Sequence, residues 1–243
     1  SKYFDLILFH SDPKFQKLAE SFSRVRDLNC QIEYTGFVAQ PIPENVVLSD
    51  FDLVNLKRSQ PMILVSIGGG RIGYELLETA IAASAILAER IPHHIQIFTG
   101  PFMPEAQFLQ LQQASVGKSN VTLERFTPNL MTYMSKADLS ISLTGYNTTM
   151  NIMRTGVRSL VVPIGHYEND KEQLVRTRKL EKMGVVEVVE PQNLEPTYLA
   201  QKIVDCLHQK PDIKSNNQFD LQGAENTAVI LKQLLMESAF ASV

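Results

Sequence analysis

The sequence predicts an α/β fold with an open, mostly parallel, Rossmann-like sheet and helices on both faces. Short apolar segments alternate with longer segments that have helical periodicity, giving about six strand–helix units. Most of the apolar segments are continuous rather than alternating, as in strands buried on both faces of a parallel sheet. Glycine or polar residues follow several of these segments directly, at the sheet edge where such folds bind ligands.

Length and composition fit a soluble globular protein. The chain has 243 residues, 44% hydrophobic and 20% charged, enough for one large or two small domains. A net charge of −3 gives no reason to expect nucleic acid as a partner. The sequence contains no apolar segment long enough to predict a transmembrane helix, and no signal-peptide pattern is present. Two cysteines, Cys30 and Cys206, fit the reducing cytoplasm.

The first part of the chain predicts one strand–helix–strand unit. Residues 4–10 form an apolar run, and Asp12-Pro13 can start a helix over residues 14–27 with one apolar face. Residues 31–38 predict a short alternating strand. Two prolines at 41 and 43 then mark a linker, and residues 41–60 are expected to be irregular. Because the chain starts at Ser1 and enters a strand almost at once, we expect a fragment or a processed chain.

The next unit contains a glycine-rich loop. A buried strand over residues 61–67 leads into Gly68-Gly69-Gly70-Arg71-Ile72-Gly73 and a helix over residues 74–90. Glycines here let the backbone approach a phosphate, or let helix and strand pack closely. A dinucleotide site also needs an acidic residue at the end of the second strand. That strand, residues 94–98, ends in Thr99-Gly100-Pro101 instead. The pattern therefore disfavours NAD as the ligand of this loop.

The same alternation continues to the end of the chain. Residues 127–129 are expected to cap a helix ending at Lys136, and a later helix stops at Gly156. No internal repeat is present. The remaining strands are predicted over residues 120–126, 139–143, 159–164 and 185–189, and the remaining helices over residues 108–113, 168–184, 196–209 and 224–236.

Residues 142–176 carry the strongest indication of a binding site. An apolar strand ends in Thr144-Gly145, and a polar turn opens a helix; a second strand is then followed by a polar loop and another helix. Backbone N–H groups and the dipole at a helix N-terminus favour phosphate or another anion. Both polar clusters would lie at the carboxyl edge of the sheet and face one crevice.

The order of these elements and two motifs resemble the C-terminal half of GT-B glycosyltransferases, above all family 28 and related predicted bacterial glycosyltransferases. The first motif is the glycine loop at residues 68–73. The second combines small residues after a strand with a Val-Pro strand end and a glutamine-bearing loop. Its members are Thr144, Gly145, Thr148, Thr149, Asn151, Gly156, Val162, Pro163, Gln173 and residues 180–184. The related group also matches residues 34–38 and 219–224.

The resemblance implies a donor-binding domain for a nucleotide-sugar, most simply a UDP-sugar, and transfer with inversion. Residues 40–243 would form this domain. Residues 1–39 would be the closing strand and helix of an otherwise absent N-terminal domain, which holds the acceptor and the usual catalytic base. The acceptor is unknown, and no catalytic residue is assigned. His10 and Asp12 could face the cleft, but a helix cap and a loop histidine are the favoured explanation.

The resemblance also assigns the donor site. Thr144, Gly145, Thr148 and Thr149 would bind the diphosphate and stabilise the charge on the leaving group; Asn147 or Thr148 could instead cap the helix. Asn151 stands where the family usually has a glutamate that bonds the ribose, so ordinary uridine-nucleotide binding is in question. Further donor-binding candidates are Gly69, Gly70, Arg71, Asn147, Phe126 at the nucleobase, His166 and Gln173 at the sugar, and Arg176.

Other interpretations stay open. A nucleotide-sugar epimerase on the same fold would need acid–base groups facing the sugar, and this half offers only His166, Glu168, Asp170 and Glu172. The chain could also be a non-catalytic nucleotide-sugar-binding module. A third interpretation is the donor subunit of a split enzyme with a separate partner chain. No cofactor is expected, and no metal site, because the acidic residues do not cluster at cation-ligand spacing.

Overall fold

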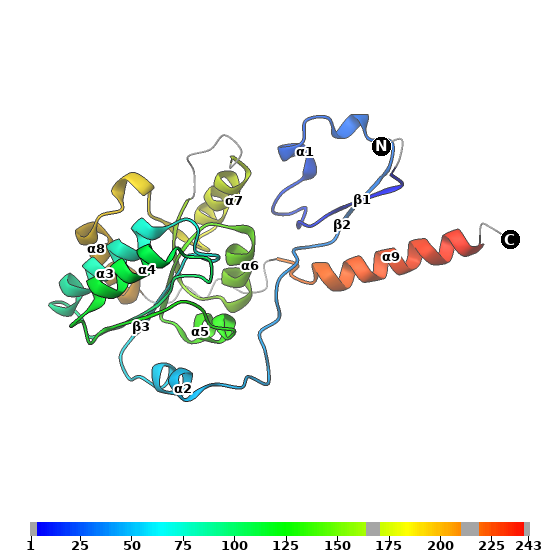
Figure 1. Ribbon diagram of the computed structural model, residues 1–243. Helices are drawn as coiled ribbons and strands as arrows, with labels where there is room; N and C mark the ends of the chain where they lie inside the picture. Colours follow the sequence, from blue (N-terminus) through cyan, green and yellow to red (C-terminus); the bar gives the residue numbers. More distant parts are fainter. Residues whose placement is uncertain (1–3, 164–170, 210–218, 241–243) are drawn as a thin grey trace. The chain divides into compact units, whose positions relative to one another are not determined.

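The computed structural model describes residues 4–163, 171–209 and 219–240 (Figure 1). Contacts divide the chain into two compact units. The larger unit is Ile42–Lys214. The smaller unit combines Ser1–Pro41 with Ser215–Val243, so the C-terminal helix groups with the first strands rather than with the larger sheet. Whether residues 1–39 close a further N-terminal domain stays a prediction.

The larger unit contains a six-stranded sheet in the order β5-β4-β3-β6-β7-β8, and every neighbouring pair is parallel. This confirms the predicted fold class. Its last strand is shorter than the predicted strand at residues 185–189. The strands are β3 (Met62–Ser66), β4 (His94–Phe98), β5 (Val121–Glu124), β6 (Leu139–Leu143), β7 (Ser159–Val162) and β8 (Glu187–Val188).

The strand order places a topological switch at the centre of this sheet. From β3 the chain moves outward through β4 to β5, and then returns to place β6 on the other side of β3. Crossovers therefore leave in opposite directions after β3 and β6, which opens a crevice between the carboxyl ends of these two strands.

Helices cover both faces of the sheet (Figure 1). One buried cluster joins alternate strand residues, among them Ile63, Val65 and Ile141, to apolar side chains of α3 and α8. On the opposite face α5 and α6 pack against each other. The helices of this unit are α2 (Asp50–Leu56), α3 (Tyr74–Ala88), α4 (Glu105–Ser115), α5 (Leu130–Lys136), α6 (Tyr146–Thr155), α7 (Lys171–Lys182) and α8 (Pro196–His208).

The sheet face opposite α3 and α8 carries buried polar side chains. Leu64 pairs with Gln96 on one side and with Ser140 on the other, and both polar residues are fully buried. Ser142 follows on the same face of β6 and is 1% exposed. These polar side-chain atoms have no hydrogen-bond partner among the described residues. The strand 139–143 is thus apolar on only one of its two faces.

Residues 41–60, expected to be irregular, contain the helix α2. Ser49 begins it with a capping box: its hydroxyl accepts from the Asp52 N–H at 3.2 Å, while the Asp52 carboxylate accepts from the Ser49 N–H at 3.1 Å. The Asp52 side chain is buried and also accepts from Tyr133 on α5. A tertiary contact therefore supports a helix of only seven residues, which local propensity would not hold.

In the smaller unit, β1 (Leu6–Phe9) pairs in parallel with β2 (Gln31–Tyr34), and α9 spans Gly223–Phe240. The predicted helix over residues 14–27 is wrong. Only α1 (Leu18–Ser21) and a 3₁₀ turn (Val25–Asp27) form. Phe15 turns into an aromatic cluster with Phe37 and Phe219, at centroid distances of 5.5 Å, whereas Phe22 is 40% exposed. Without one continuous buried face, a long helix gains little from packing.

Candidate functional site

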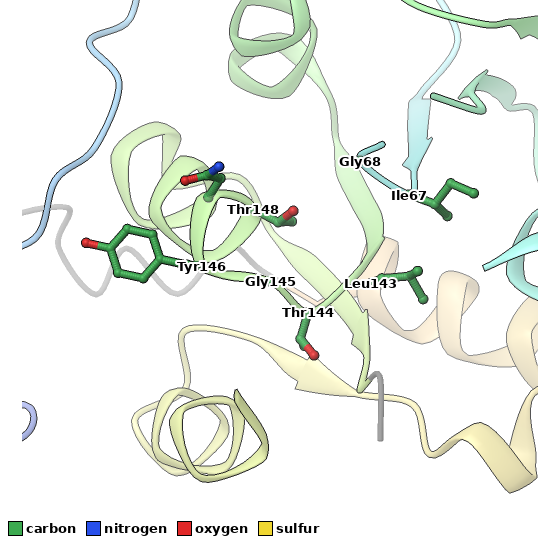
Figure 2. Close-up of a pocket in the computed structure, with 8 residues that line it drawn as sticks. Ile67, Gly68, Leu143, Thr144, Gly145, Tyr146 and Thr148 are labelled. Carbon is green, nitrogen blue, oxygen red and sulfur yellow. The ribbon is translucent and has the colours of Figure 1, made fainter. Parts of the chain in front are cut away.

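A pocket of about 270 Å³ lies at the switch point between β3 and β6 (Figure 2). The residues that follow β3 form one wall, and the end of β6 with the first turn of α6 forms the other. The pocket coincides with the first of the two predicted polar clusters, at residues 144–148, whereas residues 171–176 of the second cluster are not in its lining. Its lining consists of Ile67, Gly68, Leu143, Thr144, Gly145, Tyr146, Asn147 and Thr148.

The first turn of α6 supplies the polar part of this pocket. Gly145 is the N-cap residue, and its carbonyl accepts the first helical bond from the Thr149 N–H at 2.9 Å. An α-helix leaves its first N–H groups without intrahelical partners, so the backbone of residues 147 and 148 offers donors at the pocket. The Thr149 hydroxyl points back and donates to the Gly145 carbonyl at 2.7 Å. Thr148, which lines the pocket, thus has the more accessible hydroxyl.

Neither the backbone conformation at position 145 nor the packing around it requires a glycine. Its φ of −153° is extended backbone that any residue adopts. A Cβ built on Gly145 would meet no protein atom within 4 Å. Gly145 is also one of the residues that line the pocket. A missing side chain at this place lets a ligand approach the helix N-terminus closely.

The glycine loop after β3 serves mainly to pack two loops together. Gly70 has φ of +91°, and an added Cβ would lie 2.5 Å from the Thr99 carbonyl oxygen. Gly100 has φ of +89°, and its Cβ would lie 2.4 Å from the Gly68 carbonyl oxygen. Only Gly68 of this loop lines the pocket, so Gly69 and Gly70 do not join the other candidates there. The exposed Arg71 lies over the Phe102 ring, at 5.4 Å.

Tyr146 connects the pocket to α7. Its ring lies under the guanidinium of Arg176, 5.2 Å from centroid to Cζ, and Arg176 is only 9% exposed. The structure therefore places Arg176 next to the first turn of α6. Sequence reasoning did not single out Tyr146; an aromatic residue at the first position of a helix that follows a glycine was the available indication.

The remaining candidates are spread over the sheet edge. Asn151 lies one turn beyond Asn147 on α6 and is buried. Gln173 lies at the start of α7, and its Oε1 is buried with no hydrogen-bond partner among the described residues. Phe126, after the edge strand β5, is 62% exposed. His166 lies outside the described residues.

The smaller unit gives His10 and Asp12 structural roles. The Asp12 carboxylate accepts from the backbone N–H of Lys14, at 2.8 Å, and of Asp220, at 3.2 Å. His10 Nδ1 lies 2.8 Å from the Thr35 hydroxyl. Across residues 4–163, 171–209 and 219–240, no group of three or more His, Cys, Asp or Glu side chains could hold a metal ion. Within those same ranges, no helix is both long and apolar enough to cross a membrane.

A comparison with known families matches residues 63–233 to the glycosyltransferase family 28 C-terminal domain. The chain therefore belongs to this family. The match runs from β3 into α9 and includes the pocket and the second motif. The predicted GT-B resemblance is confirmed.

One curated relative is an enzyme of Oenococcus oeni. It is the UDP-N-acetylglucosamine–N-acetylmuramyl-(pentapeptide) pyrophosphoryl-undecaprenol N-acetylglucosamine transferase. The two sequences are 25% identical over 170 residues, covering 70% of this chain and 45% of that protein. The chain thus spans about half the length of the relative.

Solved glycosyltransferases share the fold. The spinosyn forosaminyltransferase SpnP has a TM-score of 0.64 at 13% identity, over 96% of this chain and 55% of that one. VinC, solved in complex with dTDP, has a TM-score of 0.53 at 18% identity, over 78% and 42%. A Listeria monocytogenes structure provisionally assigned as a UDP-N-acetylglucosamine 2-epimerase also has the fold, with a TM-score of 0.54 at 14% identity, over 83% and 50%.

Proposed function

We propose that this chain is the donor-binding portion of a nucleotide-sugar-dependent glycosyltransferase, with the sugar diphosphate at the N-terminus of α6. The observation that carries the proposal is the pocket at the β3–β6 switch point, with the open Gly145 backbone in its wall. Membership in the glycosyltransferase family 28 C-terminal domain supports the same function.

The geometry suits leaving-group stabilisation. In glycosyl transfer, negative charge grows on the diphosphate as the bond to the sugar breaks. The N–H groups of residues 147 and 148 and the positive end of the α6 dipole would stabilise that charge. The Thr148 hydroxyl can add a hydrogen bond from the pocket wall. No metal ion is needed for this step if backbone and side-chain donors supply the stabilisation.

The remaining parts of the proposal concern the stereochemistry, the acceptor, the donor and the compartment of the whole enzyme. We propose inversion at the anomeric carbon, with the acceptor and its general base held by a part of the enzyme outside these 243 residues. Such a base must lie within hydrogen-bond reach of the acceptor hydroxyl. The curated relative is a transferase of N-acetylglucosamine from UDP, so a UDP-sugar is the first donor to test. We propose the cytoplasm as the compartment, which the free Cys30 and Cys206 fit.

The fold does not separate a transferase from an epimerase, because structures at these identities share only the fold. The family match favours the transferase. Three of the four residues that an epimerase would need, at positions 166, 168 and 170, lie outside the described ranges. A non-catalytic module or the donor subunit of a split enzyme would use the same pocket, and both predict the same donor binding.

Calorimetric titration with UDP, dTDP, GDP and NAD tests the proposal. We expect saturable binding of one nucleoside diphosphate and none of NAD. Gly145→Ala is the sharpest variant, because it adds a methyl group at a pocket-lining position without strain or a clash with protein atoms. It should weaken binding at least about tenfold while the protein stays folded. Thr148→Ala should weaken binding less, and Asn151→Glu should strengthen UDP binding if a carboxylate is needed at the ribose.

Two outcomes would contradict the proposal. One is that the folded wild-type chain binds none of the nucleoside diphosphates. The other is that a nucleotide binds with unchanged affinity to Gly145→Ala, which would place the ligand elsewhere. Thermal unfolding of each variant separates a lost site from a lost fold.

A further inference from the structure

Two aliphatic side chains form part of the pocket lining. Ile67 follows β3 and Leu143 ends β6 (Figure 2). Both also belong to the buried core cluster that joins the sheet to α3 and α8, and they are 6% and 8% exposed. Each side chain therefore has close-packed core on one side and the pocket on the other.

Gly73 lies next to the ends of these two side chains. It is buried and is the N-cap residue of α3. A Cβ built on Gly73 would lie 2.5 Å from Leu143 Cδ1 and 3.0 Å from Ile67 Cγ2. Gly73 itself does not belong to the residues that line the pocket. The two aliphatic side chains thus keep their positions only because position 73 carries no side chain.

A Cβ added at position 73 would affect the pocket through these neighbours. Carbon atoms in contact normally lie about 3.5–4.0 Å apart, so Leu143 Cδ1 would have to move by roughly 1 Å. The core cannot supply that space, because protein interiors are packed as densely as organic crystals. The pocket is open, so the displaced side chains would move into it and reduce its volume of about 270 Å³.

We propose that Gly73 is a positioning residue of the donor site: it leaves room for Leu143 and Ile67 at the start of α3, and so keeps the pocket open for the diphosphate. The inference rests on the proposed donor site and deepens it by adding a residue that acts on the ligand only through two others. Gly73 differs in this from Gly70 and Gly100, whose added Cβ atoms would meet backbone atoms.

Calorimetric titration of the whole chain with UDP, dTDP and GDP tests this role, with the nucleotide that binds wild type used throughout. Gly73→Ala should lower the affinity for that nucleotide at least about tenfold. The loss should be smaller in a Leu143→Val background, because valine has no δ carbon to meet the added Cβ. This double-mutant cycle measures whether Gly73 acts through Leu143.

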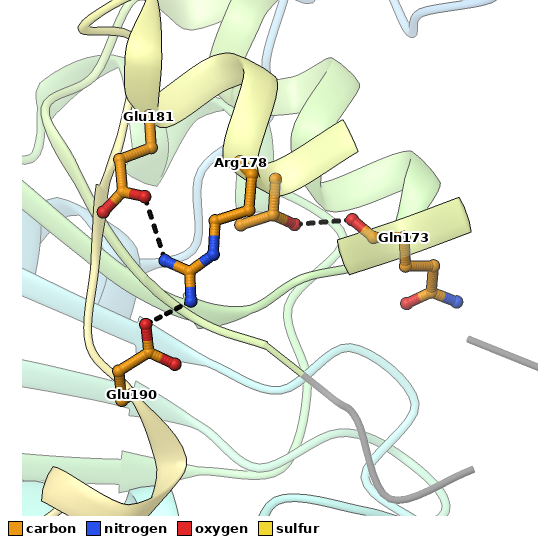
Figure 3. A network of polar contacts seen from close by, with 5 residues as sticks. Gln173, Arg178, Glu181 and Glu190 are labelled. Carbon is orange, nitrogen blue, oxygen red and sulfur yellow. Dashed lines mark hydrogen bonds and ion pairs between the residues drawn. The ribbon is translucent and has the colours of Figure 1, made fainter. Parts of the chain in front are cut away.

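Two controls separate this effect from a general loss of stability. Gly117 also has a positive φ, +78°, but a Cβ added there would meet nothing within 4 Å. Gly117→Ala therefore carries the backbone strain alone, and its affinity should stay within about twofold of wild type. Arg178 donates to Glu181 at 2.9 Å and is ion-paired with Glu190 (Figure 3). Arg178→Lys keeps the charge but weakens this network, so it should lower the unfolding temperature and leave the nucleotide affinity unchanged.

The outcomes distinguish the site from the role of Gly73. If wild type binds none of the nucleotides, the proposed donor site is wrong and the inference is lost with it. If wild type binds and a folded Gly73→Ala protein keeps its affinity, or if Leu143→Val does not reduce the loss, only the role of Gly73 is overturned. If Gly73→Ala alone does not fold, the double variant is compared with Leu143→Val. We then expect affinities within about tenfold of each other, and a larger gap would overturn the inference.

Thermal unfolding of each variant shows which of them fold.

Discussion

The hydroxyl of Tyr133 donates a 2.8 Å hydrogen bond to the carboxylate of Asp52, and both side chains are buried. This bond connects α5, which covers the sheet, to α2, which precedes the first strand of the sheet. Ser49 and Asn129 donate to the same carboxylate. Burial alone would raise the pKa of Asp52, but the hydrogen bonds prevail and lower it below 3.8.

Replacing Tyr133 by Phe should destabilise the protein by about 1–3 kcal/mol, because a buried carboxylate loses one of its donors. The ring itself stays packed on Phe98, with the centroids 5.0 Å apart. Urea unfolding at neutral pH measures the loss. Tyr198→Phe, at a position 39% exposed, is the control and should cost little. Equal effects of the two variants would show that the Asp52 bond contributes nothing.

Lowering the pH should reduce the contribution of Asp52 to the stability of the fold. A lowered pKa means that the carboxylate stabilises the fold above the unfolded value of 3.8, and that this stabilisation disappears as pH falls through the lower, folded pKa. In Tyr133→Phe the folded pKa should move back toward 3.8. The variant should therefore lose less stability than wild type when the pH is lowered below 3.8.

His94 should produce a separate pH dependence. Burial, with repulsion from Arg58 and His93, lowers its pKa from 6.5 to about 4. The folded state then holds the neutral ring, so stability is complete above pH 6.5 and falls as the pH drops toward 4. The loss should reach about 2–3 kcal/mol, since one pKa unit corresponds to about 1.4 kcal/mol.

Urea unfolding across this window checks the His94 prediction. His94→Gln should flatten the pH dependence even if it lowers stability overall, because its side chain does not titrate. A wild-type slope in His94→Gln would assign the effect to another group.

Gly100→Ala and Gly145→Ala should differ sharply in stability. At Gly100 the added Cβ meets backbone atoms at 2.4–2.5 Å, and its φ of +89° disfavours any side chain. We expect a cost of roughly 3 kcal/mol or more, from strain and overpacking together. Gly145→Ala should stay within about 1 kcal/mol of wild type, because its φ is extended and the space is open. Equal costs in urea unfolding would contradict this assignment of the two glycines.

Local sequence determined most elements of the larger unit. Short apolar segments predicted β3, β4, β6 and β7, and Gly156, with φ of +67°, ends α6 where a stop was expected. These signals depend on neighbouring residues along the chain, so they can be recognised without the fold. The polar turn at residues 144–148 followed from the same reasoning, because a turn after a buried parallel strand lies at the sheet edge.

Only the tertiary structure decided which elements meet. The pairing of β3 with β6 brings Gly68 to Thr144, and the position of α7 places the Arg176 guanidinium over the Tyr146 ring. The buried polar face of Gln96, Ser140 and Ser142 depends on which side of each strand α5 and α6 cover. The formation of α2 and the absence of a continuous helix over residues 14–27 have the same physical cause. Both were decided by contacts with residues far along the chain, which propensity alone does not contain.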